Sequence, residues 1–185
     1  TRSLFSLGAP VQVQSDDQTL RVTPLYTLEA TRAVQKRISY RVVSAMPESL
    51  PAGGAPSGFL SVPADLEMRL SGLAGGLRRE TTEDTVRAVA THLRENHTYD
   101  PAPGAAEDRE PVVRFLFETR RGHCEYFASA MALILRTAGI PARVVGGYLG
   151  GEWNELGGYL LVRQSRAHTW VEAWIPEKGW TVFDP

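Results

Sequence analysis

The sequence predicts an α+β fold in which several helices come first and an antiparallel sheet follows. Apolar residues recur at helical spacing between residues 64 and 138, and period-two patterns typical of strands follow between 142 and 184. Short Gly-rich or PEKG segments separate those strand patterns, and turns of this length suit antiparallel neighbours. With 185 residues, of which 43% are hydrophobic, the chain can bury a substantial core.

The first 45 residues predict a small β-rich segment. Leu20 and Val22, and then Ile38, Tyr40 and Val42, alternate with polar or basic residues. The segment 47–58, PESLPAGGAPSG, contains three prolines and three glycines and is typical of a linker. We therefore divide the chain into a lead-in with its linker, 1–58, and a core, 59–185.

Two helices are expected to open the core and to pack on it together. The first follows Pro63, and the Gly75-Gly76 pair weakens its end. The second covers about 82–96, with Thr81 or Thr82 as its cap. Their apolar stripes comprise Leu66, Leu70, Leu73 and Leu77 in the first helix, and Val86, Val89, Ala90 and Leu93 in the second.

The rest of the core is expected to centre on one buried helix. An irregular connection over 99–111 leads to a short helix around 112–117. A longer apolar helix then begins at Cys124 and runs to Ala138, where Gly139-Ile140-Pro141 provides a stop signal. Strands are predicted at about 142–149, 159–164, 168–175 and 180–184.

Charge and cysteine content exclude several classes of function. Twenty basic and 21 acidic residues give a net charge of −1, so we expect no nucleic-acid partner. One cysteine excludes an internal disulfide and a multi-cysteine zinc site. His92 and His97 are five residues apart and poorly placed as joint ligands, so neither metal nor cofactor is expected. The apolar run from Phe127 to Leu135 is too short to span a bilayer, and a soluble, monomeric fragment is expected.

Three residues in separate blocks together fit nucleophilic catalysis. Cys124 begins a helix, whose N-terminal N–H groups favour thiolate over thiol. His168 begins a strand 44 residues later, and Asp184 follows another strand 16 residues further on. Each has an ordinary alternative, namely a buried core cysteine, a surface histidine and an Asp-Pro turn. Together they supply a nucleophile, a base and an orienting carboxylate.

The blocks around these residues resemble a known family. The segments RRGHCEYFASAMALILRTAGIPARVVGGYLGGEW (120–153) and VRQSRAHTWVEAWIPEKGWTVFDP (162–185) are similar to the transglutaminase-like family within the papain-like superfamily. The likeness covers about 59–185 and is greatest to extracytoplasmic domains of bacterial membrane proteins. It implies a central cysteine-bearing helix packed on an antiparallel sheet, with Cys124, His168 and Asp184 as the catalytic triad.

The resemblance also implies an activity and a location. Thiol-dependent acyl transfer on protein or peptide substrates, as in protein-glutamine gamma-glutamyltransferase, is the leading expectation. A cysteine protease or amidase with the same triad, or a non-catalytic module that binds cell-envelope peptides, remains an alternative. The full-length protein is expected to be anchored in a bacterial membrane, with this domain on the periplasmic or cell-surface side. Tyr99 near the oxyanion and Trp170 along a substrate groove are further candidates, although either aromatic ring can simply pack on the core.

The triad requires one particular strand register. Asp184 shares a face of the sheet with His168 only if Trp174 pairs with Trp180, which leaves the five residues 175–179 as the connection. Gly179 in a left-handed conformation would close that loop. The same register places Trp170 and Trp174 on the face of His168, which we expect to be the catalytic face.

Overall fold

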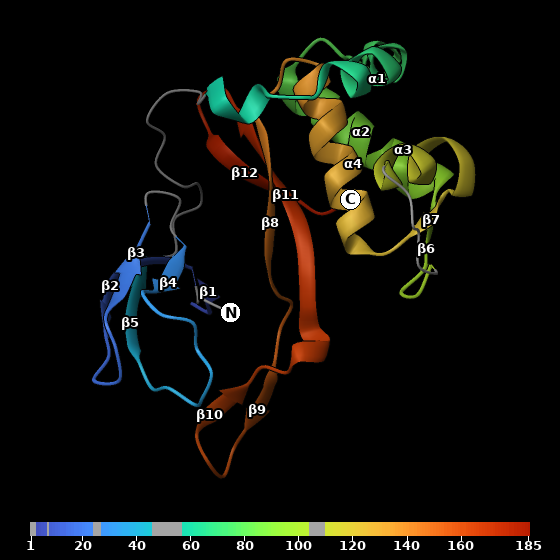
Figure 1. The fold of residues 1–185 in the computed structure, drawn as a ribbon. Helices are drawn as coiled ribbons and strands as arrows, with labels where there is room; N and C mark the ends of the chain where they lie inside the picture. Colours follow the sequence, from blue (N-terminus) through green and yellow to red (C-terminus); the bar gives the residue numbers. More distant parts are fainter. Residues whose placement is uncertain (1–2, 7, 24–26, 46–56, 104–109) are drawn as a thin grey trace. The chain divides into compact units, whose positions relative to one another are not determined.

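A computed structural model describes residues 3–6, 8–23, 27–45, 57–103 and 110–185 (Figure 1). The chain forms two compact units, Thr1–Pro51 and Ala52–Pro185. Most of the predicted linker, 47–58, falls outside the described residues, but Ser57–Leu60 forms a 3₁₀ turn, η1, within the second unit.

The first unit is β-rich, as the sequence predicts. Its strands are β1 (Ser3–Leu4), β2 (Ala9–Gln14), β3 (Leu20–Val22), β4 (Leu28–Ala30) and β5 (Arg41–Ala45). They form a three-stranded sheet in the order β1-β4-β3 and a β2-β5 pair. The last strand begins at Arg41, later than the predicted Ile38, because the Ser39 N–H donates to the Asp17 carboxylate and takes no part in a ladder.

Two helices open the second unit within one residue of their predicted positions. They are α1 (Ala64–Leu77) and α2 (Thr82–Asn96). Thr81 caps α2, since its hydroxyl accepts from the Asp84 N–H at 3.0 Å. Leu70 of α1 and Leu93 of α2 are fully buried in the same core. The prediction of a shared core is therefore confirmed.

The predicted helix at 112–117 is longer and changes its winding. It begins as α3 (Pro111–Arg114), with Pro111 at the first position, where its missing N–H costs no hydrogen bond. It continues as one π-helical turn, η2 (Phe115–Thr119), and ends at Arg120, whose φ of 51° lies in the left-handed region. Short parallel strands β6 (Thr98–Tyr99) and β7 (Arg121–Gly122) then lead into the central helix.

The central helix α4 (Cys124–Thr137) forms the middle of the core. Its Ala128, Met131 and Leu135 are fully buried. The helix ends in a Schellman motif, in which the Gly139 N–H donates to the Arg136 carbonyl and the Ile140 N–H donates to the Leu135 carbonyl. Gly139 has a φ of 81°, which explains why the predicted stop signal works.

The central sheet has the order β12-β11-β8 and is antiparallel throughout. Its strands are β8 (Ala142–Tyr148), β11 (Ala167–Ile175) and β12 (Gly179–Phe183). The prediction of a strand at 159–164 as part of the main sheet is wrong in its length and in its pairing. Its first three residues form β10 (Tyr159–Leu161), which pairs with an unpredicted β9 (Glu152–Asn154) in a separate hairpin. These strands are exposed on nearly every side, so burial imposes no alternating pattern on their sequence.

The two faces of the central sheet are covered differently. Val171 and Ala173 are fully buried against the core that contains α4, and Figure 1 shows α4 running alongside β11. On the opposite face, Arg143 and Glu172 form a buried ion pair of 2.6 Å. The Arg143 guanidinium also lies 4.5 Å from the centre of the Trp180 ring.

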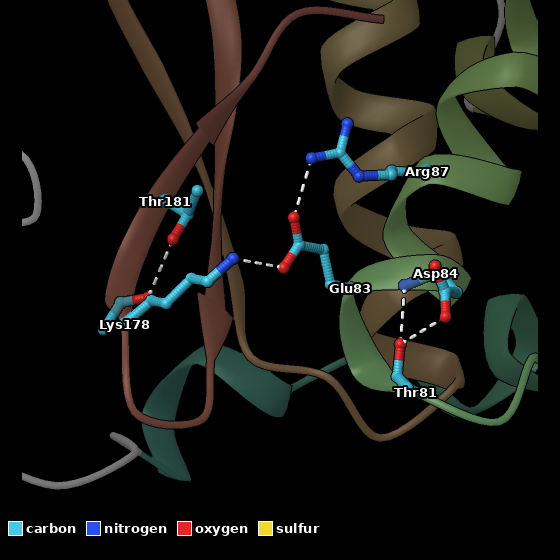
Figure 2. Close-up of polar contacts among 7 residues, drawn as sticks. Thr81, Glu83, Asp84, Arg87, Lys178 and Thr181 are labelled. Carbon is cyan, nitrogen blue, oxygen red and sulfur yellow. Dashed lines mark hydrogen bonds and ion pairs between the residues drawn. The ribbon is translucent and has the colours of Figure 1, made fainter.

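A second ionic cluster ties the sheet to α2. Glu83 in the first turn of α2 accepts hydrogen bonds from Lys178, in the β11–β12 turn, and from Arg87 (Figure 2). The position of the β11–β12 hairpin is therefore linked to the start of α2. Among the described residues, no helix is both long and apolar enough to cross a bilayer.

Candidate functional site

Cys124 is the first residue of α4, as the sequence predicts. The preceding His123 has an extended backbone, and its Nδ1 accepts from the Glu125 N–H at 3.3 Å, which fixes the start of the helix. Gly122 allows this entry, because a Cβ there would lie 2.8 Å from the Tyr126 Cβ. The thiol is free and half-buried.

His168 and Asp184 meet at the end of the sheet. The β11–β12 ladder pairs Trp174 with Trp180 and continues to Val171 and Phe183, so the predicted register is confirmed. Gly179 has a φ of 76°, also as expected. Asp184 follows the last paired residue, and its carboxylate oxygens lie 2.8 and 3.0 Å from Nε2 of His168. This bond leaves Nδ1 as the ring nitrogen available to another partner.

One open pocket, with a volume of about 310 Å³, brings the three residues together. Cys124 and Phe127 come from α4, while His168 and Asp184 come from the sheet and the segment after it. The complete lining is Arg94, His97, Tyr99, Cys124, Phe127, His168, Thr169, Asp184 and Pro185. A thiol, an imidazole and a carboxylate thus share one solvent-accessible space.

The two aromatic candidates lie in different places. Tyr99 lines the pocket and is 60% exposed. Trp170 is not among the lining residues; its ring stacks on His168 with a centroid distance of 6.4 Å. It also covers Gly147, where a Cβ would lie 2.5 Å from the indole Cη2. Trp170 is therefore placed to support the His168 ring rather than to line the pocket.

The cysteine-bearing helix and the His168 side chain lie on different faces of the central sheet. Alternation places Trp170 and Trp174 on the face of His168, but α4 packs on the opposite face, that of Val171. The pocket includes Thr169 of the Val171 face together with His168, so it lies at the end of β11. Trp174 thus shares the face of His168, as the register requires, but it does not line the pocket, because the cysteine-bearing helix covers the other face.

Sequence reasoning missed several residues of the pocket. Phe127 lies one helical turn after Cys124, a spacing that could have identified it. His97 was considered only as a metal ligand, yet it is buried in the pocket wall, with Nε2 3.3 Å from the Leu116 carbonyl oxygen. Burial lowers the pKa of His97, which favours the neutral imidazole. Arg94 carries no signal in the sequence that distinguishes it from a surface arginine.

Comparison with known proteins identifies the class to which this fold and pocket belong. Residues 71–185 match the family model of the transglutaminase-like superfamily. The chain belongs to this superfamily. The papain-like arrangement expected from the sequence, a central helix beginning at cysteine and packed on an antiparallel sheet, is therefore confirmed.

Two bacterial proteins are similar to this chain over most of its length. The chain is 40% identical over 192 aligned residues to a protein of Pseudomonas aeruginosa named protein-glutamine gamma-glutamyltransferase, and the match covers 98% of this chain and 28% of that protein. It is also 40% identical to a Bacillus subtilis protein, YebA, over 69% of this chain and 18% of that one. The chain thus spans less than a third of either relative.

A solved structure matches the chain over its whole length. It is the periplasmic domain of TgpA from Pseudomonas aeruginosa, with a TM-score of 0.82 and 36% sequence identity. The match covers 100% of this chain and 65% of that one. Within the described residues, no group of three or more histidine, cysteine or acidic side chains is arranged to hold a metal ion.

Proposed function

We propose that this domain catalyses acyl transfer through a thioester on Cys124, and that its main reaction is that of a protein-glutamine gamma-glutamyltransferase. The observation that carries the proposal is the bond between Asp184 and Nε2 of His168 in a pocket that also contains Cys124. That bond leaves Nδ1 of His168 for the thiol. The family and the named relative favour transferase chemistry.

In the proposed mechanism, Nδ1 of His168 takes the proton of the Cys124 thiol. The thiolate attacks the carbonyl carbon of a glutamine side chain, and a C–S bond forms as the C–N bond breaks. His168 returns the proton to the leaving ammonia. An amine then attacks the thioester, a new C–N bond forms as the C–S bond breaks, and a proton of the amine passes through His168 to the sulfur, which restores the thiol. Asp184 holds the imidazole by its Nε2–H and stabilises the cation formed during transfer.

The same groups can serve two alternative functions. If water attacks the thioester, the product is a carboxylate and the domain acts as an amidase or protease. If the pocket only binds peptides, no thioester forms. The matched family and relative support the transferase, while the open pocket admits water and keeps hydrolysis as the second candidate.

One incubation separates these functions. The domain is mixed with glutamine-bearing peptides, with and without a primary amine, and the peptide masses are followed. Transfer adds the amine and releases ammonia, hydrolysis of the side chain adds about one mass unit, and proteolysis shortens the peptide. Cys124→Ala removes one sulfur atom at a half-buried site and should keep the fold while abolishing each reaction. Activity retained in that variant would exclude the mechanism.

We also propose a periplasmic or cell-surface location for this domain, within a protein anchored in a bacterial membrane. The support is its full-length match to a periplasmic domain. Alkylation of Cys124 in intact cells by a membrane-impermeant maleimide tests this location. Labelling that requires cell lysis would contradict it.

A further inference from the structure

The pocket lining contains one arginine, Arg94, in the last turn of α2. The chain continues along the lining with His97, just after that helix, and Tyr99 in β6; these three residues form the α2 side of the pocket. Asp184 is the acidic residue among the lining residues, and its carboxylate is bound to His168. The charge of Arg94 therefore has no free carboxylate as a counterpart among the lining residues.

The Arg94 guanidinium is exposed and available to a ligand. It forms no hydrogen bond or ion pair with any residue in the parts of the chain that the structure describes. Arg87, two turns earlier on the same helix, is instead paired with Glu83 at 2.7 Å. Asp100, the acidic residue that follows Tyr99, is paired with Arg121 at 3.2 Å. Within the part of the chain that the structure describes, these acidic groups thus leave Arg94 without an ionic partner.

A second cation, Arg120, lies outside the pocket lining. Its charge is the least of the causes that lower the pKa of His97, of which burial is the largest. Glu95, the acidic residue next to Arg94, lines a different groove on α2 together with His92. An anion in the Cys124 pocket would therefore meet the charge of Arg94, while the Asp184 carboxylate is already bound to His168.

We infer that Arg94 selects acyl donors that carry a carboxylate close to the reactive carbonyl, such as a glutamine followed by glutamate or a glutamine at a chain end. This inference deepens the proposed function and depends on Cys124 being the reactive group. The carboxylate belongs to the donor, because a cationic lysine acceptor would be repelled by the same guanidinium. The ordinary role of Arg94, complementing the negative end of the α2 dipole, predicts no such selectivity.

The test uses two alkylating peptides that differ only in charge. Chloroacetyl-Gly-Glu-amide and chloroacetyl-Gly-Gln-amide both react by attack of the Cys124 sulfur on the methylene carbon, with loss of chloride. The ratio of their second-order rate constants, measured by mass spectrometry, reports the preference for the carboxylate. We expect a ratio of about three to ten in the native domain, in line with one partly exposed charge-assisted bond. The ratio should fall as ionic strength rises.

Variants then assign the preference to Arg94. Arg94→Gln should bring the ratio close to one, and Arg94→Lys should keep part of it because the charge remains. Arg87→Gln is the matched control on the same helix and should leave the ratio unchanged. Melting curves of all variants verify folding. An equal ratio in the native domain and in Arg94→Gln would overturn the inference.

The alkylation does not require acyl transfer, so the two proposals can fail separately. A ratio that depends on Arg94, combined with no mass change in the glutamine peptides, would reject the transferase and keep the anion site. Transfer to glutamine peptides, combined with equal alkylation by the two chloroacetyl peptides, would keep the transferase and reject the anion site.

Discussion

His168 and Asp184 meet because β12 places the carboxylate one residue beyond its last ladder pair. Replacing Asp184 by Asn keeps the shape of the side chain but puts an N–H group where the acceptor stood, which favours the wrong imidazole tautomer. We expect the rate of acyl transfer to fall by roughly 10²- to 10⁴-fold. The Asp184 side chain is 51% exposed, so the melting temperature should change by no more than about 3 °C. Steady-state kinetics and a thermal scan measure both.

An unchanged rate in Asp184→Asn would show that another group orients His168. Gln164→Ala, at the 3₁₀ turn η3 (Gln164–Arg166) before β11, is a matched control near the site. It should leave the rate close to that of the native domain, since Gln164 does not line the pocket.

Gly147 offers a second test at the scale of single residues. A Cβ there would lie 2.5 Å from the Trp170 ring, which stacks on His168. Gly147→Ala should therefore destabilise the fold by about 1–3 kcal/mol and slow acyl transfer by displacing the imidazole. Gly146→Ala is the control, because a Cβ at that neighbouring position meets no atom within 4 Å. Urea unfolding and kinetics on both variants compare them, and equal destabilisation would contradict the packing argument.

At the scale of elements, the contact between the β11–β12 turn and α2 depends on the charge of Glu83. Hydrogen bonds from Lys178 and then from Arg87 lower the pKa of Glu83 (Figure 2). A carboxylate whose pKa is lower in the folded state contributes stability above its unfolded value, near 4.5, and loses that contribution as the pH falls through the folded value. The melting temperature of Glu83→Gln should therefore be below that of the native domain at pH 7 and approach it near pH 3.

Glu155→Gln provides the control for this pH dependence. Glu155 lies in the β9–β10 turn and has no ion pair with the described residues. The melting temperature of Glu155→Gln should differ little from that of the native domain, both at pH 7 and near pH 3. If the melting temperatures of Glu83→Gln and the native domain differ as much near pH 3 as at pH 7, the shape of the side chain and not its charge stabilises this contact.

The helices were predictable because local signals agree with their packing. Thr81 at the start of α2 and Gly139 after α4 mark ends that the structure confirms, and the apolar stripes between them are buried. The β9–β10 hairpin was missed for the opposite reason. Trp153 and Leu160 lie opposite each other and remain 63% and 42% exposed, so no buried face imposed a pattern on the sequence.

The site was predictable only in part. Cys124, His168 and Asp184 were identified from their three sequence blocks together with the family resemblance, and this choice required the strand register that the structure confirms. Arg94 and His97 were not identified, because their role depends on how the end of α2 meets the start of α4. The contact between these two helix ends depends on packing between segments far apart in the sequence, so no periodic pattern in the sequence predicts it.

At the scale of the whole molecule, the second unit contains a complete core of its own. All members of the cluster around α4 lie between Leu70 and Phe183. We therefore expect residues 52–185, produced alone, to unfold in one cooperative transition and to keep the Cys124 alkylation rate of the whole chain within about twofold. Differential scanning calorimetry and alkylation kinetics test this. A fragment without a cooperative transition would show that Thr1–Pro51 is needed for folding.

The order of the pocket residues along the chain has a consequence for biosynthesis. Cys124 emerges from the ribosome before His168, and the carboxylate that orients the imidazole comes last, at Asp184. The helix with the thiol and the strands with its partners are joined only through long-range contacts, which form late in folding. During synthesis the thiol of Cys124 is therefore without the imidazole and the carboxylate until β12 has formed and paired with β11.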